Sequence, residues 1–167
     1  LRECMDLARR SLKNHSRDDL KRSLEGMVDT GCSRLFVGDE TIAKHDLALR
    51  KIFGLRIRYV PCAARTFHFA DGQTAQSTWV AAYPVGFGGK SGIIRLCVVR
   101  GPAPLLISEG FLEDLDGEFK SRSGTLHLRA LGVTVALRRS KENPSSKQWR
   151  LPLAEYGPHG HRMPERK

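Results

Sequence analysis

Residues 28–33 read VDTGCS, and this stretch decides how the rest of the chain is interpreted. The apolar pair Met27 and Val28 predicts a short strand, and the Asp-Thr-Gly that follows predicts a tight turn leaving it. Gly31 lets the backbone of such a turn approach another group closely, and the Thr30 hydroxyl can bond to backbone within the turn. The pattern therefore places the carboxylate of Asp29 on a turn at the end of a buried strand.

A carboxylate in this position suits peptide hydrolysis by a pair of carboxylates. Two carboxylates about 3 Å apart cannot both ionise, so they share one proton; one then acts as a base toward water and the other as an acid toward the carbonyl. The chain contains one Asp-Thr-Gly, so the second carboxylate has to come from a second copy. A C2 homodimer supplies it by setting Asp29 opposite its symmetry mate. Asp-Thr-Gly is also an ordinary turn sequence, so the order of the other elements decides between the two readings.

Helical patterns lie on both sides of this turn. Residues 2–24 carry apolar side chains at helical spacing, with a break near Asn14 and a capping pattern at Ser16. Residues 39–53 begin with acidic side chains, end with basic ones and are followed by Gly54, as expected for a complete helix. We place His45 on the exposed face of this second helix.

The remainder of the chain predicts strands. Residues 67–69 alternate apolar and polar, residues 70–73 read ADGQ, a hairpin turn signal, and a strand follows up to Tyr83. Residues 93–99 form an apolar run, residues 105–107 a short strand, and Ser108 can cap a short helix. Three late strands follow at 118–120, 125–128 and 133–137. A linker is expected over 140–148, a last strand near 149–153, and no ordered structure beyond Tyr156. This composition predicts a mainly β domain with a closed or orthogonally packed barrel.

Taken together, this order of motifs resembles the retropepsin-like aspartic proteases of retroviruses and retrotransposons. In that family an Asp-Thr-Gly strand is followed by a flap hairpin, a buried strand, a Pro-containing loop, and a short strand leading into a helix. The resemblance covers about residues 26–137. It implies a closed retropepsin-like β-barrel over residues 26–139, with the helix at 39–53 inserted after the catalytic strand. Residues 1–25 are then a helical N-terminal extension, and residues 140–167 a basic linker and tail.

The resemblance also implies functional roles for two groups of residues. The expected catalytic residues are Asp29, Thr30 and Gly31, and the expected substrate-binding flap residues are Ala70, Asp71, Gly72 and Gln73. The implied function is an aspartic endopeptidase that cleaves an extended polyprotein segment as a homodimer. Ser108 stands where the family has Gly, Cys32 stands where Ala or Ser is usual, and the upstream segment is helical where the family has strands. A catalytically inactive binding or dimerisation module of the same fold is the alternative.

The distribution of charge and the spacing of the cysteines argue against two other classes of function, nucleic-acid binding and metal binding. Residues 138–167 contain eight basic and three acidic residues, which is half of the net charge of +10. A tail-weighted excess and 7% aromatic residues argue against a general nucleic-acid-binding surface, although the tail could make weak polyanion contacts. The four cysteines include no Cys-x-x-Cys pair, so neither metal nor cofactor is expected.

The same features predict the location of the protein. No apolar run approaches the roughly 18 residues of a membrane span, and no apolar signal region opens the chain. The even number of cysteines permits disulfides, but without a signal region a reducing compartment fits better, so we expect an intracellular, cytoplasmic protein without membrane contact. We expect Trp79, on the strand after the hairpin turn, to pack in the core or against a second copy; the alternative is the wall of a substrate pocket.

Overall fold

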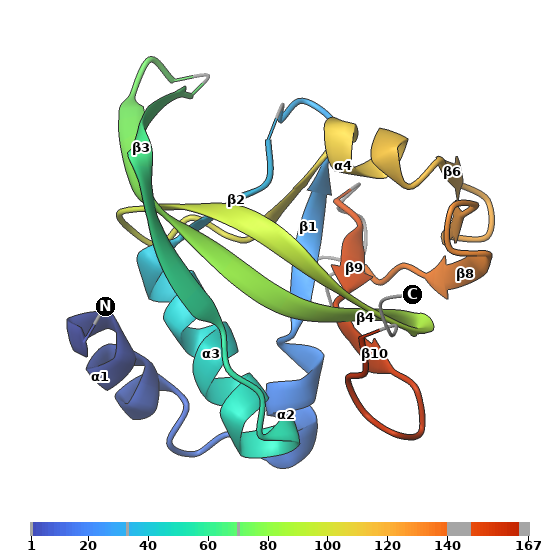
Figure 1. Ribbon diagram of the computed structural model, residues 1–167, viewed down its shortest axis with the longest axis horizontal. Coiled ribbons are helices and arrows are strands. Elements are labelled where there is room, and N and C mark those ends of the chain that lie inside the picture. Colours follow the sequence, from blue (N-terminus) through green and yellow to red (C-terminus); the bar gives the residue numbers. More distant parts are fainter. Residues whose placement is uncertain (1, 33, 70, 140–147, 164–167) are drawn as a thin grey trace. The chain divides into compact units, whose positions relative to one another are not determined.

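The structure is a computed structural model that describes residues 2–32, 34–69, 71–139 and 148–163 (Figure 1). The chain divides into two compact units that alternate along the sequence. Unit 1 comprises Leu1–Ser23, Phe36–Tyr83 and Ile94–Leu105. Unit 2 comprises Leu24–Leu35, Pro84–Ile93 and Leu106–Lys167. The Asp-Thr-Gly turn therefore belongs to unit 2, and the predicted flap hairpin belongs to unit 1.

Three helices form one part of unit 1: α1 (Arg2–Ser11), α2 (Arg17–Arg22) and α3 (Asp39–Phe53). The break between α1 and α2 falls where the sequence predicts it, because Ser16 and Asp19 form a reciprocal capping box at the start of α2. Both short helices pack on α3, which spans the predicted residues 39–53. The sequence predictions of helix in these regions are confirmed.

His45 of α3 is buried, with 6% of its surface exposed, so its predicted surface position is wrong. The helix is covered by α1 and α2 as well as by a strand, so even a polar position of α3 can be enclosed. The His45 Nδ1 lies 2.7 Å from the Tyr83 hydroxyl, and this hydrogen bond satisfies the buried imidazole. The Ile42, Ala48 and Leu49 side chains of α3 are fully buried and form part of the core of unit 1.

The strands of unit 1 are β2 (Phe36–Gly38), β3 (Arg58–His68) and parts of β4 (Thr74–Val99). β2 runs parallel to the end of β4, with Phe36 opposite Cys97. β3 runs antiparallel to the start of β4, from Arg58 opposite Ala82 to His68 opposite Thr74. The long strand β4 doubles back on itself (Figure 1), and Gly88 and Gly89 within it have positive φ values of 56° and 88°.

Unit 2 contains β1 (Glu25–Asp29) and the short helix α4 (Glu109–Asp114). β1 pairs in parallel with β5 (Leu106–Ser108) and antiparallel with β9 (Arg150–Pro152). The last strand, β10 (Ala154–Tyr156), pairs in parallel with β4 at Gly86 and Gly89. The chain beyond Tyr156 is also ordered as far as it is described: His161 Nε2 bonds to the Gly92 carbonyl at 2.9 Å, contrary to the expectation for that segment.

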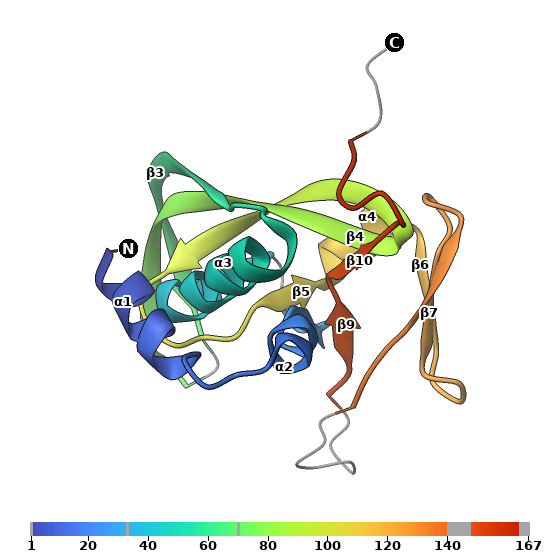
Figure 2. The same ribbon diagram turned by 90° about the horizontal axis from the view of Figure 1, so that it is seen from below.

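A separate antiparallel sheet completes unit 2. It consists of β6 (Gly117–Lys120), β7 (Thr125–Leu128) and β8 (Val133–Ala136), with β7 in the middle (Figure 2). The inward side chains of β7 and β8, Leu126, Leu128 and Val135, are buried. The sequence predicts all three strands near these positions.

The fold is mainly β, with 45% strand and 25% helix. The described residues form no closed barrel, so that part of the prediction is wrong. The strands form open mixed pairings within each unit, and the three late strands pair only with one another. Short turns join these late strands. Strands that are joined by short turns pair most readily with each other, so the three form a sheet of their own. None of the helices in the described part of the chain has the length and apolar character of a membrane span.

Candidate active site

The Asp-Thr-Gly turn leaves the end of β1 as the sequence predicts. Asp29 is the last residue of β1, and Asp29, Thr30 and Gly31 are all exposed. The Gly31 N–H donates to Asp29 Oδ1 at 3.0 Å, and the Cys32 N–H donates to the Asp29 carbonyl at 3.1 Å. A Cβ atom on Gly31 would lie 3.2 Å from Asp29 Oδ1. Glycine at this position therefore leaves room for the carboxylate that its own N–H orients.

The neighbouring strand β5 and the start of α4 hold the turn in place. Asp29 lies opposite Ser108 in the parallel register of β1 and β5. The Ser108 side chain is buried, and its hydroxyl accepts from the Phe111 N–H at 3.3 Å, which caps α4. The Glu109 N–H donates to the Cys32 carbonyl at 3.4 Å. Both sides of the Asp29 turn are thus tied to the start of α4.

Cys32 follows the turn but is poorly suited to act as a nucleophile. Its Sγ donates to the Arg34 carbonyl at 2.9 Å. Burial raises the pKa of the Cys32 thiol above its ordinary value, and the nearby Asp29 carboxylate acts in the same direction. The thiolate is the reactive form of cysteine, so the Cys32 side chain stays a neutral thiol around neutral pH. The ionisable group that the turn presents to solvent is the Asp29 carboxylate.

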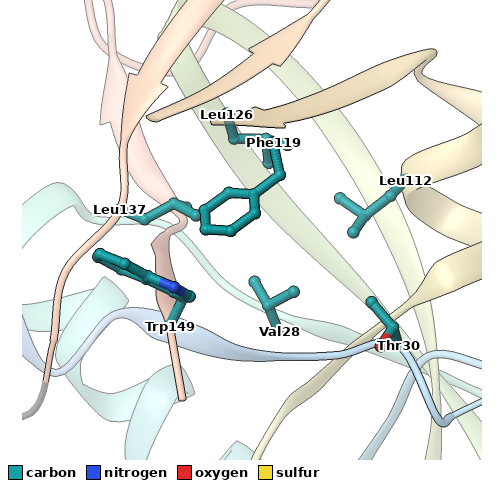
Figure 3. A pocket seen from close by; sticks show the side chains of 7 residues that line it. All are labelled: Val28, Thr30, Leu112, Phe119, Leu126, Leu137 and Trp149. Atoms are coloured by element: carbon teal, nitrogen blue, oxygen red, sulfur yellow. The ribbon is translucent and has the colours of Figure 1, made fainter. Parts of the chain in front are cut away.

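The opposite face of β1 borders an apolar cavity of about 310 Å³ within unit 2 (Figure 3). Side chains alternate along a strand, so Val28 and Thr30 point away from the face that carries Asp29. The lining residues come from β1 and the turn after it, from α4, from the small sheet and the residue that follows it, and from the segment before β9: Val28, Thr30, Leu112, Phe119, Leu126, Leu137 and Trp149. The Phe119 and Trp149 rings meet edge to face, with centroids 5.6 Å apart. Sequence patterning does not identify this cavity, because its walls come from residues far apart in the chain.

The predicted flap residues Asp71, Gly72 and Gln73 lie between β3 and β4, at the tip of their hairpin. The Phe69 N–H donates to the Gln73 carbonyl at 2.9 Å, and the Gln73 N–H donates to Asp71 Oδ1 at 2.9 Å. Gly72 has a φ of 85°, which a glycine adopts without strain. Asp71, Gly72 and Gln73 are exposed, and Ala70 lies outside the described residues. The prediction of a tight hairpin turn at this point is confirmed.

Aromatic packing holds the end of this hairpin that leads into the tip, within unit 1. The Phe36 ring lies 5.4 Å from that of Phe67 and 5.8 Å from that of Phe69, measured between centroids. Trp79, farther along the hairpin, is 42% exposed, so it does not pack in the core of this chain; packing against a second copy, the other part of that expectation, stays a prediction. Its register partner is Pro61, next to a local irregularity in the pairing of β3 and β4. Residues 71–73 at the tip are thus exposed, while the two phenylalanines directly before them pack on Phe36.

The structure brings Asp29, Thr30, Gly31 and Ser108 together, and places residues 71–73 in the other unit. In the described ranges, no group of three or more His, Cys, Asp or Glu side chains is arranged to hold a metal ion. Comparison of the chain with protein-family models, with curated proteins and with solved structures finds no match in any of the three. A function therefore has to be inferred from the residues of this chain.

Proposed function

We propose that this chain is a homodimeric aspartic endopeptidase of the retropepsin type, which hydrolyses peptide bonds in an extended polyprotein segment. The observation that carries the proposal is the exposure and orientation of the Asp29 carboxylate. Its carboxylate stands exposed at the end of a paired strand, oriented by the Gly31 N–H at 3.0 Å. The turn offers no side chain at Gly31 that would hinder the approach of a second carboxylate.

In the proposed mechanism, two Asp29 carboxylates face one another across the two-fold axis of a dimer and share one proton. The ionised carboxylate takes a proton from a water molecule as the water oxygen attacks the scissile carbonyl carbon. The protonated carboxyl group gives its proton to the carbonyl oxygen, which yields a neutral tetrahedral diol. Collapse of the diol returns a proton to the leaving nitrogen and breaks the C–N bond. The pair ends with one proton, as it began.

The proposed substrate is an extended peptide rather than a folded protein. An extended chain satisfies its backbone hydrogen bonds like an added strand, and alternate side chains point to opposite sides. The exposed hairpin tip at residues 71–73 has the form of a flap that closes on such a peptide. Phe67 and Phe69, directly before the tip, pack on Phe36, so a movement of the proposed flap would have to break or carry along these ring contacts.

The test is the Asp29→Asn variant of the full chain, assayed on a mixture of unstructured peptides with the products identified by mass spectrometry. Asn keeps the shape of the side chain but cannot ionise, so we expect cleavage to fall at least about a hundredfold. The matched control is Asp114→Asn, which removes another exposed carboxylate of unit 2 and should retain full activity. Equal cleavage by wild type and Asp29→Asn would eliminate Asp29 as a catalytic residue.

A subunit-mixing experiment tests whether both carboxylates are needed in one site. Wild type and Asp29→Asn are mixed in equal amounts and allowed to exchange. If only wild-type dimers are active, the activity should be about a quarter of that of wild type at the same total concentration, rather than about a half. A value of one half would show that one chain suffices. A wild-type dimer that cleaves no peptide between pH 3 and 8 would instead support the inactive dimerisation module.

A further inference from the structure

The apolar cavity of unit 2 has a buried floor, an aromatic wall and an open edge. Leu126 and Leu137 form the floor, and both are buried. Phe119 stands at the edge with 44% of its surface exposed, so the cavity opens to solvent at this ring. Figure 3 shows Trp149 and Thr30 at opposite ends of the hollow. A concave site with mainly apolar and aromatic walls and few polar groups is typical of small-molecule binding.

The aromatic wall is held in place by contacts that do not involve a ligand. The Trp149 carbonyl accepts from the Val28 N–H at 2.9 Å. A Cβ atom on Gly124 would lie 2.8 Å from the Trp149 ring, so glycine at this position lets the indole pack against the turn between β6 and β7. The Arg139 guanidinium lies over the ring, 4.5 Å from its centroid, and the Phe119 ring meets it edge to face. Because this wall is already ordered, a ligand does not have to order it on binding.

The size and chemistry of the lining limit the class of ligand. The volume is about 310 Å³, whereas a dry cavity of about 150 Å³ already holds benzene. One ring with a short substituent, or two fused rings, therefore fit. None of the lining side chains carries a charge, and burying an unpaired charge costs far more than burying a neutral group. The aromatic wall favours a further ring, because aromatic rings attract one another edge to face beyond the area that they bury.

We propose that the cavity of unit 2 is a binding site for a small uncharged aromatic molecule of one or two rings, which packs against Phe119 and Trp149. The ligand contacts the face of β1 opposite to the Asp29 carboxylate, so the site goes beyond the proposed function and does not depend on it. Residues 140–147, between Leu137 and Trp149 in the sequence, read SKENPSSK and offer no large apolar side chain that could take the place of the ligand.

The test is isothermal titration calorimetry of the full chain with 4-methylphenol, which is uncharged at neutral pH. We expect one site per chain with a dissociation constant of about 1 mM or below. Leu112→Trp and Val28→Phe each enlarge a half-buried side chain of the lining, and each should raise the dissociation constant at least about tenfold by filling the cavity. The matched control is Leu115→Trp, at a half-buried leucine that follows α4 and does not line the cavity; it should bind 4-methylphenol like the wild type.

Two further compounds test the ligand class. 4-Methylbenzoate has the same ring but is charged at neutral pH, and it should bind at least about tenfold more weakly than 4-methylphenol. 4-Methylcyclohexanol is uncharged but not aromatic, and it should bind at least about threefold more weakly. Equal affinity for 4-methylbenzoate would reject the uncharged class, and equal affinity for 4-methylcyclohexanol would reject the aromatic class.

Trp149 gives a second readout that locates the ligand. In a Trp79→Phe background, Trp149 is the sole tryptophan of the chain, and its emission should change as 4-methylphenol saturates the site. Retained far-ultraviolet circular dichroism shows that the variants fold. The proposal would be overturned by absence of binding up to about 10 mM 4-methylphenol, by binding that both Leu112→Trp and Val28→Phe leave unchanged, or by Trp149 emission that does not follow the titration. None of these measurements uses cleavage, so loss of the protease proposal would leave this one standing.

Discussion

Asp29 and Ser108 lie opposite each other at the ends of two parallel strands, and the Ser108 hydroxyl is turned to the start of α4 rather than left without a partner. The retropepsin-like resemblance would place Gly at this position. Here the hydroxyl accepts from the Phe111 N–H, so the extra side chain has a structural use. The strand that carries the proposed catalytic carboxylate and the helix that follows β5 are thereby joined through one residue.

Because the Ser108 hydroxyl caps α4, we expect substitutions of Ser108 to change the stability of the fold more than the rate of cleavage. Ser108→Ala removes the cap and should lower the free energy of unfolding by about 1 kcal/mol, whereas Ser108→Gly should lower it by only a few tenths. The Ser108→Gly variant should keep kcat/KM within about threefold of wild type, a change of under about 1 kcal/mol in activation free energy. Urea unfolding and peptide cleavage on one preparation measure both. A large gain in cleavage by Ser108→Gly would show that the hydroxyl obstructs the Asp29 turn.

A second prediction concerns His45 and acid stability. Burial lowers the pKa of His45 to about 4 from an ordinary value of 6.5. The unfolded chain therefore binds this proton more readily than the folded chain. The stabilisation is complete above about pH 6.5 and is lost as the pH falls toward 4, by about 3 kcal/mol in total.

The measurement is the free energy of unfolding from urea titrations between pH 4 and 7. His45→Gln keeps a polar partner for Tyr83 but does not titrate, so its stability should change less over this range. His15→Gln, at an exposed histidine of the same unit, should keep the wild-type pH dependence. An unchanged slope in His45→Gln would assign the acid sensitivity to other groups.

The parts of the fold that can be predicted from the sequence are those that depend on local signals. The helix at 39–53 is predictable because its acidic start, basic end and terminal Gly54 agree with one another. The hairpin at residues 69–73 and the turn after Asp29 follow from turn chemistry that involves only a few adjacent residues. The amino-acid pattern alone therefore suffices to place the catalytic candidate on its turn.

What sequence patterning misses depends on contacts between distant segments. His45 is polar, which predicts a surface position, but α1 and α2 also pack on α3. The prediction of a closed barrel is wrong because the alternation of apolar and polar residues identifies strands but does not determine which strands pair. The cavity brings Val28 of β1 next to Trp149 near the other end of the chain, and no local pattern encodes that approach.

A third prediction concerns the pH dependence of cleavage. The two-carboxylate mechanism needs one ionised and one protonated carboxyl group, so kcat/KM should follow a bell-shaped curve on the acid side of neutrality. Stability is measured at the same pH values, so that unfolding linked to His45 is separated from the acid limb of the curve. A rate that only rises above pH 8 would indicate a different nucleophile.

The last prediction concerns the hairpin tip. Gly72 has a φ of 85°, and a Cβ at this position meets no atom within 4 Å. Gly72→Val therefore introduces backbone strain of about 1–2 kcal/mol without a steric clash. Gly132, which follows β7 at a φ of 66° and is equally open, provides the matched control in Gly132→Val. Both variants should lose a similar free energy of unfolding, but only Gly72→Val should lose cleavage, by about tenfold or more, because a flap must change conformation as a peptide enters. Urea midpoints and kcat/KM are measured on the same preparations. Equal kcat/KM in the two variants would show that the hairpin tip is a passive surface turn, and the assignment of residues 71–73 as a flap would then be withdrawn.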